Sequence, residues 1–325
     1  MVKRHRGPLS TTVELEAPAS RNPSREPSSP NSVKPNGGLR SQAEIAIGSL
    51  EGLPPFGRLM RFWRSVFNVS QGELAERLNV SLKHVSYLET GRSRPSEALI
   101  GRIGHVFRLS QRDLQNLLIA ANYFADPTSE SRPATSDRTE REALIATLRS
   151  LDPFPASIID PFGNVKMVNR AWVFVSGKML GERIHEPALN AYRLFFMEGG
   201  WLSRTVNWEN VASWLLMALH QEVLLHNDPQ AEHLIRQFQS SAKMPRDWAR
   251  QAIRNQPSTS HYPTEIRMDD GEVRSYLIVT HSVGAYPLSL GGRLWISIVY
   301  PKDFRPDVSP DELAAVHLTH SRLPY

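Results

Sequence analysis

The stretch at residues 70–95, SQGELAERLNVSLKHVSYLETGRSRP, constrains the fold more than any other part of the chain, because it predicts two short helices joined by a tight turn. Ser70 and Glu73 have the spacing of a capping box, in which both side chains bind backbone amides at a helix start. The first helix therefore begins at Gln71. Its apolar residues share one face at helical spacing, and we expect them to be buried: Leu74, Ala75 and Leu78. Asn79 suits the left-handed backbone position that ends such a helix.

Ser81 predicts the start of the second helix, because a serine hydroxyl can cap the first amides of a helix. Val85 and Leu88 form the apolar face of this helix. The opposite face is small and polar with a single charge, and we expect its residues to contact base edges in a major groove: Leu82, Lys83, Ser86 and Tyr87. Three neighbouring polar residues are candidates for phosphate contacts: Gln71, Arg92 and Arg94.

The positive charge of the chain is concentrated around this stretch. The net charge is +5, and residues 56–108 alone hold nine basic and four acidic side chains, a surplus of five. The rest of the chain is therefore balanced. Basic side chains that neutralise phosphates release counterions, which makes binding to nucleic acid favourable and salt-dependent. The location of the surplus thus agrees with a DNA backbone as the partner of this segment.

Residues 70–95 resemble the helix-turn-helix of the Xre and phage-repressor family. Its pattern is met by Ser70, Gln71, Leu74, Ala75, Leu78, Val80, Ser81, Val85, Ser86, Glu89, Gly91 and Pro95. Asn79 stands where the family usually has Gly, and Asn tolerates the same backbone region. The resemblance implies a buried ion pair between Arg64 and Glu89. It also implies a homodimer that binds a double-stranded DNA operator with inverted half-sites.

The boundaries of the first domain follow from composition and capping signals. Residues 1–42 are rich in Pro, Ser, Arg and Asn, which predicts a disordered tail. Residues 43–125 form an all-α domain of five helices, with the further helices expected at 56–67, 96–107 and 111–123. Residues 126–138 have almost nothing to bury and predict a linker. A helix at 139–151 would then open the second domain.

The second domain, residues 139–306, is expected to be α+β, and residues 307–325 form a C-terminal tail. Strand patterns occur at 155–160, 165–169, 264–267, 273–281 and 293–300, with a helix-rich middle between the second and the third. Two strands, several helices and three strands predict an antiparallel sheet with helices on one face, and exclude a doubly wound parallel sheet.

This order resembles a PAS-like fold, and its pairing with an Xre-type helix-turn-helix resembles the MmyB-like regulators. The resemblance spans about residues 54–302 and rests on segments such as FPASIIDPFGNVKMVNRAW, AYRLFF and VNWENVASWLL, while the strands after Pro263 match least well. It implies a small apolar ligand such as a fatty acid. The candidate ligand-binding residues are Phe195, Trp208, Trp214 and Met217 for the apolar part, and Arg193 or Asn169 for a carboxylate. Aromatic residues of this density also serve as ordinary core, and the two polar residues fit surface or turn positions equally well.

The sequence also excludes several function classes. The chain has no cysteine, so it holds no disulfide, thiolate nucleophile or cysteine-ligated metal, which fits a reducing cytoplasm. No catalytic or phosphate-binding motif is present, the histidines lack a metal-ligand pattern, and no run has the length of a membrane span or a signal peptide. We therefore expect no cofactor, no metal, no membrane association and no catalysis. The alternative is an enzyme or small-molecule carrier with an accessory helix-turn-helix.

Overall fold

The computed structural model describes Leu50 and residues 52–123, 134–239, 244–245, 247–255, 261–283 and 294–325. The predicted tail at 1–42 lies outside the described residues, and so does most of the predicted linker. The helix predicted to begin at Thr139 already begins at Ala134, so the predicted linker is helical from residue 134 on. No helix within the described ranges is long and apolar enough to cross a bilayer.

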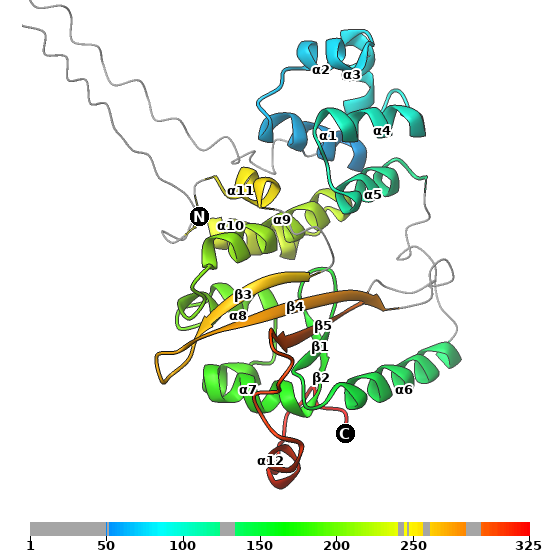
Figure 1. Ribbon diagram of the computed structural model, residues 1–325. Coiled ribbons are helices and arrows are strands. Elements are labelled where there is room, and N and C mark those ends of the chain that lie inside the picture. Colours follow the sequence, from blue (N-terminus) through cyan, green and yellow to red (C-terminus); the bar gives the residue numbers. More distant parts are fainter. Residues whose placement is uncertain are drawn as a thin grey trace, which may run out of the picture. The chain divides into compact units, whose positions relative to one another are not determined.

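The five predicted helices of the first domain are confirmed (Figure 1). They are α1 (Pro55–Val66), α2 (Gln71–Leu78), α3 (Leu82–Glu89), α4 (Glu97–Val106) and α5 (Gln111–Ala120). Each of α2 to α5 begins after a serine whose side chain accepts an amide hydrogen bond: Ser70, Ser81, Ser96 and Ser110. Local capping chemistry therefore sets the helix starts that the sequence predicts.

The second domain contains a five-stranded antiparallel sheet in the order β2-β1-β5-β4-β3. Its strands are β1 (Ala156–Ile159), β2 (Val165–Val168), β3 (His261–Arg267), β4 (Val273–Val283) and β5 (Leu294–Pro301). Its helices are α6 (Ala134–Leu151), α7 (Arg170–Leu180), η2 (Gly181–His185), α8 (Ala191–Phe196), η3 (Trp201–Ser203), α9 (Trp208–His226), α10 (Pro229–Gln239), α11 (Trp248–Arg254) and α12 (Pro310–Ala315). The α+β class is confirmed.

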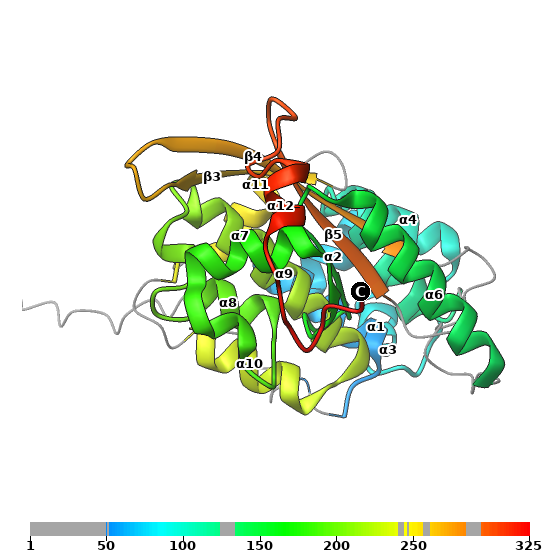
Figure 2. The same cartoon turned by 90° about the horizontal axis from the view of Figure 1, so that it is seen from below.

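Helices cover both faces of this sheet, so the expectation of helices on one face is wrong. On one face, Leu144 and Leu148 of α6 pack against Ile158, Ile296 and Ile298 of the central strands, and Figure 2 shows α6 along this side of the sheet. The other face meets α9. The first strand after Pro263 was also predicted too short, since β3 begins at His261.

The face toward α9 is called the inner face here. The ring of Tyr262 on β3 packs against Trp214 of α9, with ring centroids 5.8 Å apart, which fixes the side that Tyr262 points to. Tyr262 lies opposite Ile278, and side chains alternate along a strand, so the positions on this face follow from the register. They include Ser157, Tyr262, Thr264, Ile278, Thr280, Trp295, Ser297 and Val299.

The C-terminal segment that was expected to be a tail packs onto the second domain. Val308 and Leu313 are buried against Ala171 of α7, and Figure 2 shows α12 beside α7. The backbone amide of Val168 on the edge strand β2 donates to the carbonyl of Arg322 at 3.0 Å. The segment therefore protects one edge of the sheet from pairing with another chain.

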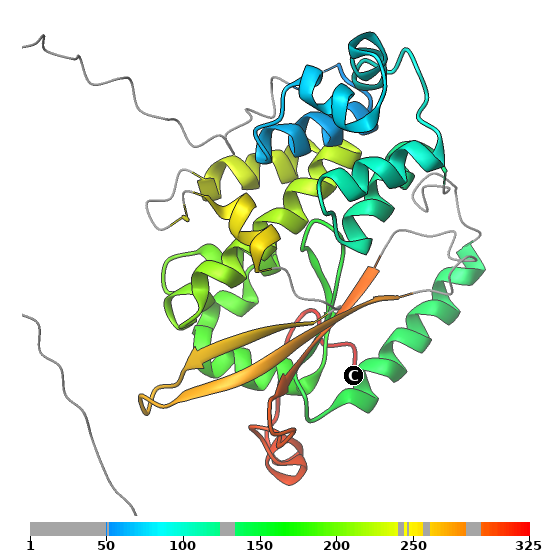
Figure 3. The same cartoon turned by 45° about the horizontal axis from the view of Figure 1, so that its top comes forward.

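The two domains share one hydrophobic core, which the division at residues 126–138 did not anticipate. Buried residues of α1, α2, α4 and α5 belong to the same cluster as those of α9, α10 and α11, and Figure 3 shows these groups of helices next to each other. Arg58 of α1 is buried and its guanidinium donates to the carbonyls of Leu224 and Leu225, at 2.7 and 3.2 Å. The arginine thus satisfies carbonyl groups in the last turn of α9.

Candidate functional site

The turn between α2 and α3 is fixed by hydrogen bonds within it. The amide of Glu73 donates to Ser70 Oγ at 3.1 Å, and the amide of Ser70 donates to Glu73 Oε2 at 2.7 Å, so the predicted capping box is present. Asn79 has φ of 51°, the left-handed conformation expected at the end of α2. The amide of His84 donates to Ser81 Oγ at 3.1 Å and starts α3. Local sequence therefore determines how α3 leaves the turn.

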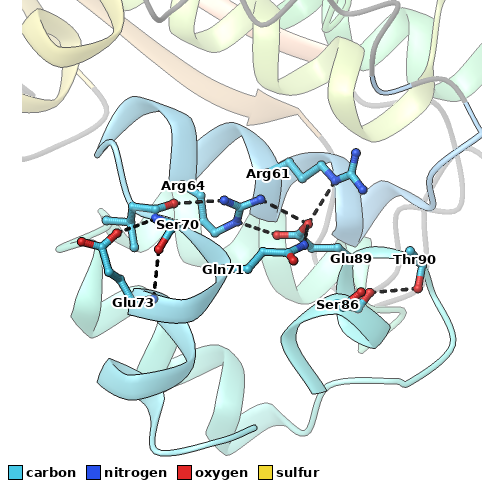
Figure 4. A network of polar contacts seen from close by, with 9 residues as sticks. Arg61, Arg64, Ser70, Gln71, Glu73, Ser86, Glu89 and Thr90 are labelled. Atoms are coloured by element: carbon cyan, nitrogen blue, oxygen red, sulfur yellow. Dashed lines mark hydrogen bonds and ion pairs between the residues drawn. The ribbon is translucent and has the colours of Figure 1, made fainter. Parts of the chain in front are cut away.

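A buried carboxylate holds α3 against α1 and α2 (Figure 4). Glu89 is fully buried, and Arg64 Nε lies 2.6 Å from its Oε1, which confirms the predicted ion pair. Arg61 Nε lies 3.0 Å from Glu89 Oε2, and Gln71 Nε2 donates to the same oxygen at 2.7 Å. Arg61 and Gln71 were not predicted as members of this network. A buried carboxylate is stable only with such partners, so the network fixes the position of α3.

The outer face of α3 carries the four residues predicted to contact bases. Leu82 is 56% exposed. Lys83 is exposed, and Ser86 and Tyr87 are half-buried. Lys83 Nζ lies 5.4 Å from the centroid of the Tyr87 ring, and Arg92 Cζ lies 5.8 Å from it. Lys83 and Arg92 are therefore both close to the ring of Tyr87. The structure places these three predicted DNA-contacting residues next to one another.

Arg94, which was predicted to contact phosphate, is exposed and also binds the end of α5. Its Nε donates to the carbonyl of Ala121 at 3.2 Å and its Nη2 to the carbonyl of Asn122 at 2.9 Å. Its guanidinium also lies over the ring of Tyr123, 4.9 Å from the centroid. Arg94 therefore satisfies carbonyl groups at the end of α5, where a cation is favourable.

In the second domain, the central strand β5 is less completely covered on the inner face than on the face toward α6. On the central strand β5, Ile296 and Ile298 are buried under α6, whereas Trp295, Ser297 and Val299 are half-exposed toward α9. Three hydroxyl residues stand in line across this face, because Ser157 lies opposite Ser297 and Ser297 lies opposite Thr280. A partly exposed sheet face with a few aligned polar groups is a suitable wall for a small molecule.

Three of the predicted apolar ligand residues gather beside the inner face. Phe195, Trp208 and Trp214 belong to one cluster together with Tyr262. Met217 is buried in the core shared with the DNA-binding helices. Two polar atoms at this junction, Trp214 Nε1 and Thr264 Oγ1, are buried and have no hydrogen-bond partner among the described residues. Buried donors and acceptors are normally satisfied, so these two leave unused hydrogen-bonding capacity between α9 and β3.

The two polar ligand candidates lie elsewhere. Asn169 is fully buried as the cap of α7, and its Oδ1 accepts from the amides of Ala156 and Trp172, both at 2.9 Å. Its Nδ2 donates to the carbonyl of Phe154 at 2.8 Å. Asn169 is therefore a turn-fixing residue and does not face a ligand. Arg193 is exposed and lines a surface cleft of about 350 Å³ with residues of the hairpin loop, the cap of α8 and α10: Phe162, Asn164, Asn190, His233 and Leu234.

The sheet residues of the inner face were not among the residues predicted from sequence to bind a ligand. The predicted residues lie mainly in the aromatic helical middle of the domain, whereas the strands place Tyr262, Thr264, Thr280, Trp295 and Ser297 on the inner face. The alternation of small polar and apolar residues in SYLIVTHS and LWISIVY was the available signal. Within the described ranges, no three His, Asp or Glu side chains are grouped as a metal site would require.

Comparison with known proteins agrees with this division into two functional regions. Residues 55–117 match the profile of a helix-turn-helix domain, and residues 141–303, half of the chain, match the MmyB-like transcription regulator ligand binding domain. An uncharacterized HTH-type transcriptional regulator of Archaeoglobus fulgidus is 39% identical over 62 residues. These residues cover 19% of this chain and 27% of that protein, so the chain spans about a quarter of the length of this relative.

Among solved structures, the PAS domain of an HTR-like protein from Haloarcula marismortui aligns with 52% of this chain and 99% of its own, with a TM-score of 0.22 and 10% identity. The family assignment rests on the two sequence profiles, which match the regions that carry α3 and the sheet. The chain belongs to the MmyB-like transcription regulators, with a helix-turn-helix domain followed by the ligand-binding domain of that family.

Proposed function

We propose that this protein is a sequence-specific DNA-binding transcription regulator whose affinity for its operator responds to a small apolar ligand. The observation that carries the proposal is the outer face of α3, where Leu82, Lys83, Ser86 and Tyr87 lie together on a helix held by the buried carboxylate of Glu89. A rigid helix with small and polar side chains suits direct readout of base edges. A regulator that binds DNA acts where the DNA is, so we propose that the protein acts in the cytoplasm.

Phosphate contacts are assigned to two residues that flank α3. Arg92 is exposed and lies beside Tyr87, so its guanidinium can reach the backbone next to the bases that α3 contacts. Gln71 uses one amide hydrogen for Glu89 and has a second one for a phosphate oxygen. The protein is proposed to bind as a homodimer, with the two copies of α3 about one DNA turn apart on an inverted repeat.

The ligand is proposed to lie between the inner face and α9. This site offers the apolar side chains of Val299, Ile278 and the Trp214 cluster, and hydroxyl groups at Ser297 and Thr280. The mixture suits a molecule that is mainly apolar with a few polar atoms, such as a fatty acid. The regulator-type domains favour this role over the alternative of an enzyme with an accessory helix-turn-helix.

Selection of DNA from a random pool by the full-length protein tests the DNA assignment. We expect an enriched inverted repeat. Lys83→Ala and Tyr87→Ala should each lose about 1–3 kcal/mol of discrimination between this repeat and scrambled DNA. Lys302→Ala, which removes an exposed lysine of the second domain, is the matched control and should keep full discrimination. Unchanged discrimination in both α3 variants would reject the assignment of α3.

Extraction of the purified protein with organic solvent, followed by mass spectrometry, tests the ligand assignment. We expect an apolar molecule in the extract, and an increase in the melting temperature when decanoate is added to stripped protein. An empty extract together with an unchanged melting temperature would reject the apolar ligand and leave the DNA assignment standing.

A further inference from the structure

The first turn of α5 brings a cation from the DNA-binding domain onto the ligand-binding sheet. The guanidinium carbon of Arg112 lies 5.2 Å from the centroid of the Trp295 ring. Trp295 belongs to the inner face and precedes Ser297 by two residues. Ser297 is one of the three aligned hydroxyl residues of that face, with Ser157 and Thr280. A residue of the DNA-binding domain therefore forms part of the boundary of the proposed ligand site.

The charge of Arg112 is not balanced by a neighbour in the part of the chain that the structure describes. No described carboxylate lies within ion-pair distance of it, and its side chain is exposed. The adjacent carboxylate of Asp113 accepts hydrogen bonds from Ser110 and from Gln221 of α9. A guanidinium that stacks on an aromatic ring keeps its N–H groups directed outward in its own plane, where they can bind a carboxylate in bidentate fashion.

The influence of this charge reaches into the second domain. Burial raises the pKa of the Tyr192 phenol, and the positive charge of Arg112 acts on the same phenol in the opposite direction. The negative charge of Glu222 raises the pKa of Tyr192 as well. The carboxylate of Glu222 is buried in α9, 3.5 Å from His226 Nε2. The interior next to α8 and α9 therefore experiences a cation that the DNA-binding domain supplies.

The residue after Arg112 ties the same turn to α9. Gln221 Nε2 donates to Asp113 Oδ1 at 2.6 Å, and Gln221 Oε1 accepts from Asn116 Nδ2. All three side chains are buried, so this amide network fixes α5 against α9. A ligand that binds Arg112 would therefore act on the first turn of α5. This turn is fixed to α9 by the amide network and belongs to the DNA-binding domain.

We propose that Arg112 is the anion-binding residue of the ligand site, so that an acidic ligand on the inner face contacts the DNA-binding domain directly. The acid group would lie above Trp295, with the apolar part extending over Val299 and Ile278 toward Trp214. The ligand class is then an apolar carboxylic acid. Binding of the ligand to Arg112 would shift α5, and through α5 it would shift α3. This inference rests on the proposed function, because it assumes that the inner face binds a ligand.

The test compares decanoate with decanol, which have the same chain and differ in the acid group, by calorimetry on the stripped full-length protein. Wild-type protein should bind decanoate roughly tenfold or more tightly than decanol. Arg112→Gln should lose this preference while keeping its affinity for decanol, and Arg112→Lys should keep part of it. Arg138→Gln is the matched control, since Arg138 is an exposed arginine of α6 paired with Glu142. Melting temperatures establish that all variants are folded.

A second readout is the effect of decanoate on DNA affinity, which should be present in wild-type and Arg138→Gln protein and absent in Arg112→Gln. A wild-type preference for decanoate that survives in Arg112→Gln would overturn the assignment of Arg112 while leaving the ligand site in place. Equal binding of both probes by wild-type protein would also overturn it. Binding of neither probe would overturn the apolar ligand of the proposed function and this inference with it.

Discussion

Acidification should destabilise the core shared by the two domains through one buried side chain, His220 of α9. Its ring lies between Phe62 of α1 and Trp248 of α11, with centroid distances of 4.8 and 5.5 Å. Neither ring nitrogen has a hydrogen-bond partner among the described residues. Burial lowers the pKa of His220 from 6.5 to about 4. The native state therefore holds this histidine neutral, and a proton on it would be an unpaired charge in an apolar site.

The sign and size of the effect follow from this shift. The unfolded chain takes up a proton near its ordinary pKa and the folded chain does so only near a pH of about 4, so unfolding is favoured as the pH falls between these values. At about 1.4 kcal/mol per pKa unit, the full loss of stability is about 3 kcal/mol. About 2 kcal/mol of it should be lost between about pH 7 and about pH 5.

The measurement is urea unfolding of wild-type and His220→Leu protein at both pH values, followed by tryptophan fluorescence. Leucine fills a similar volume and does not titrate. Carboxylates elsewhere contribute equally to both proteins, so the difference between the two pH dependences isolates His220. A wild-type free energy of unfolding that falls with pH no more steeply than that of His220→Leu would refute the reasoning.

Three further predictions concern other contacts. Glu89→Ala leaves Arg61 and Arg64 without their shared carboxylate and should lower the free energy of unfolding by about 3 kcal/mol in urea titrations; a loss below about 1 kcal/mol would contradict a structural role of this network. Arg92→Ala should weaken binding to all DNA sequences alike and reduce the slope of log K against log salt by roughly 0.9, and an unchanged slope would remove its phosphate contact. Asn169→Ala should lower stability by about 3 kcal/mol with unaltered decanoate affinity, since Asn169 caps α7; a selective loss of decanoate binding would instead return it to the ligand site.

The parts of the structure that were predicted correctly depend on neighbours in sequence. The capping box of Ser70 and Glu73 and the left-handed Asn79 involve residues a few positions apart, so the sequence pattern contains all the interacting groups. The pair of Arg64 and Glu89 was predicted from the family resemblance, which supplied the long-range contact that local patterns lack.

The parts that could not be predicted depend on packing between distant segments. Gln221 and His220 are polar residues within an apolar helix, and nothing near them in sequence indicates that they meet Asp113 and Phe62 of the other domain. The contact of Arg94 with the end of α5 could not be predicted either, because that carbonyl lies 27 residues away. The second covered face of the sheet depends likewise on α6 packing against β5, more than a hundred residues later.

The most direct test of the account is the affinity of the full-length protein for its selected operator with and without saturating decanoate, measured by fluorescence anisotropy at one fixed salt concentration. The operator should be bound roughly 1,000-fold or more tightly than scrambled DNA. Decanoate should change the operator affinity by roughly fivefold or more. Equal affinity for operator and scrambled DNA, or an operator affinity that decanoate leaves unchanged, would contradict the account.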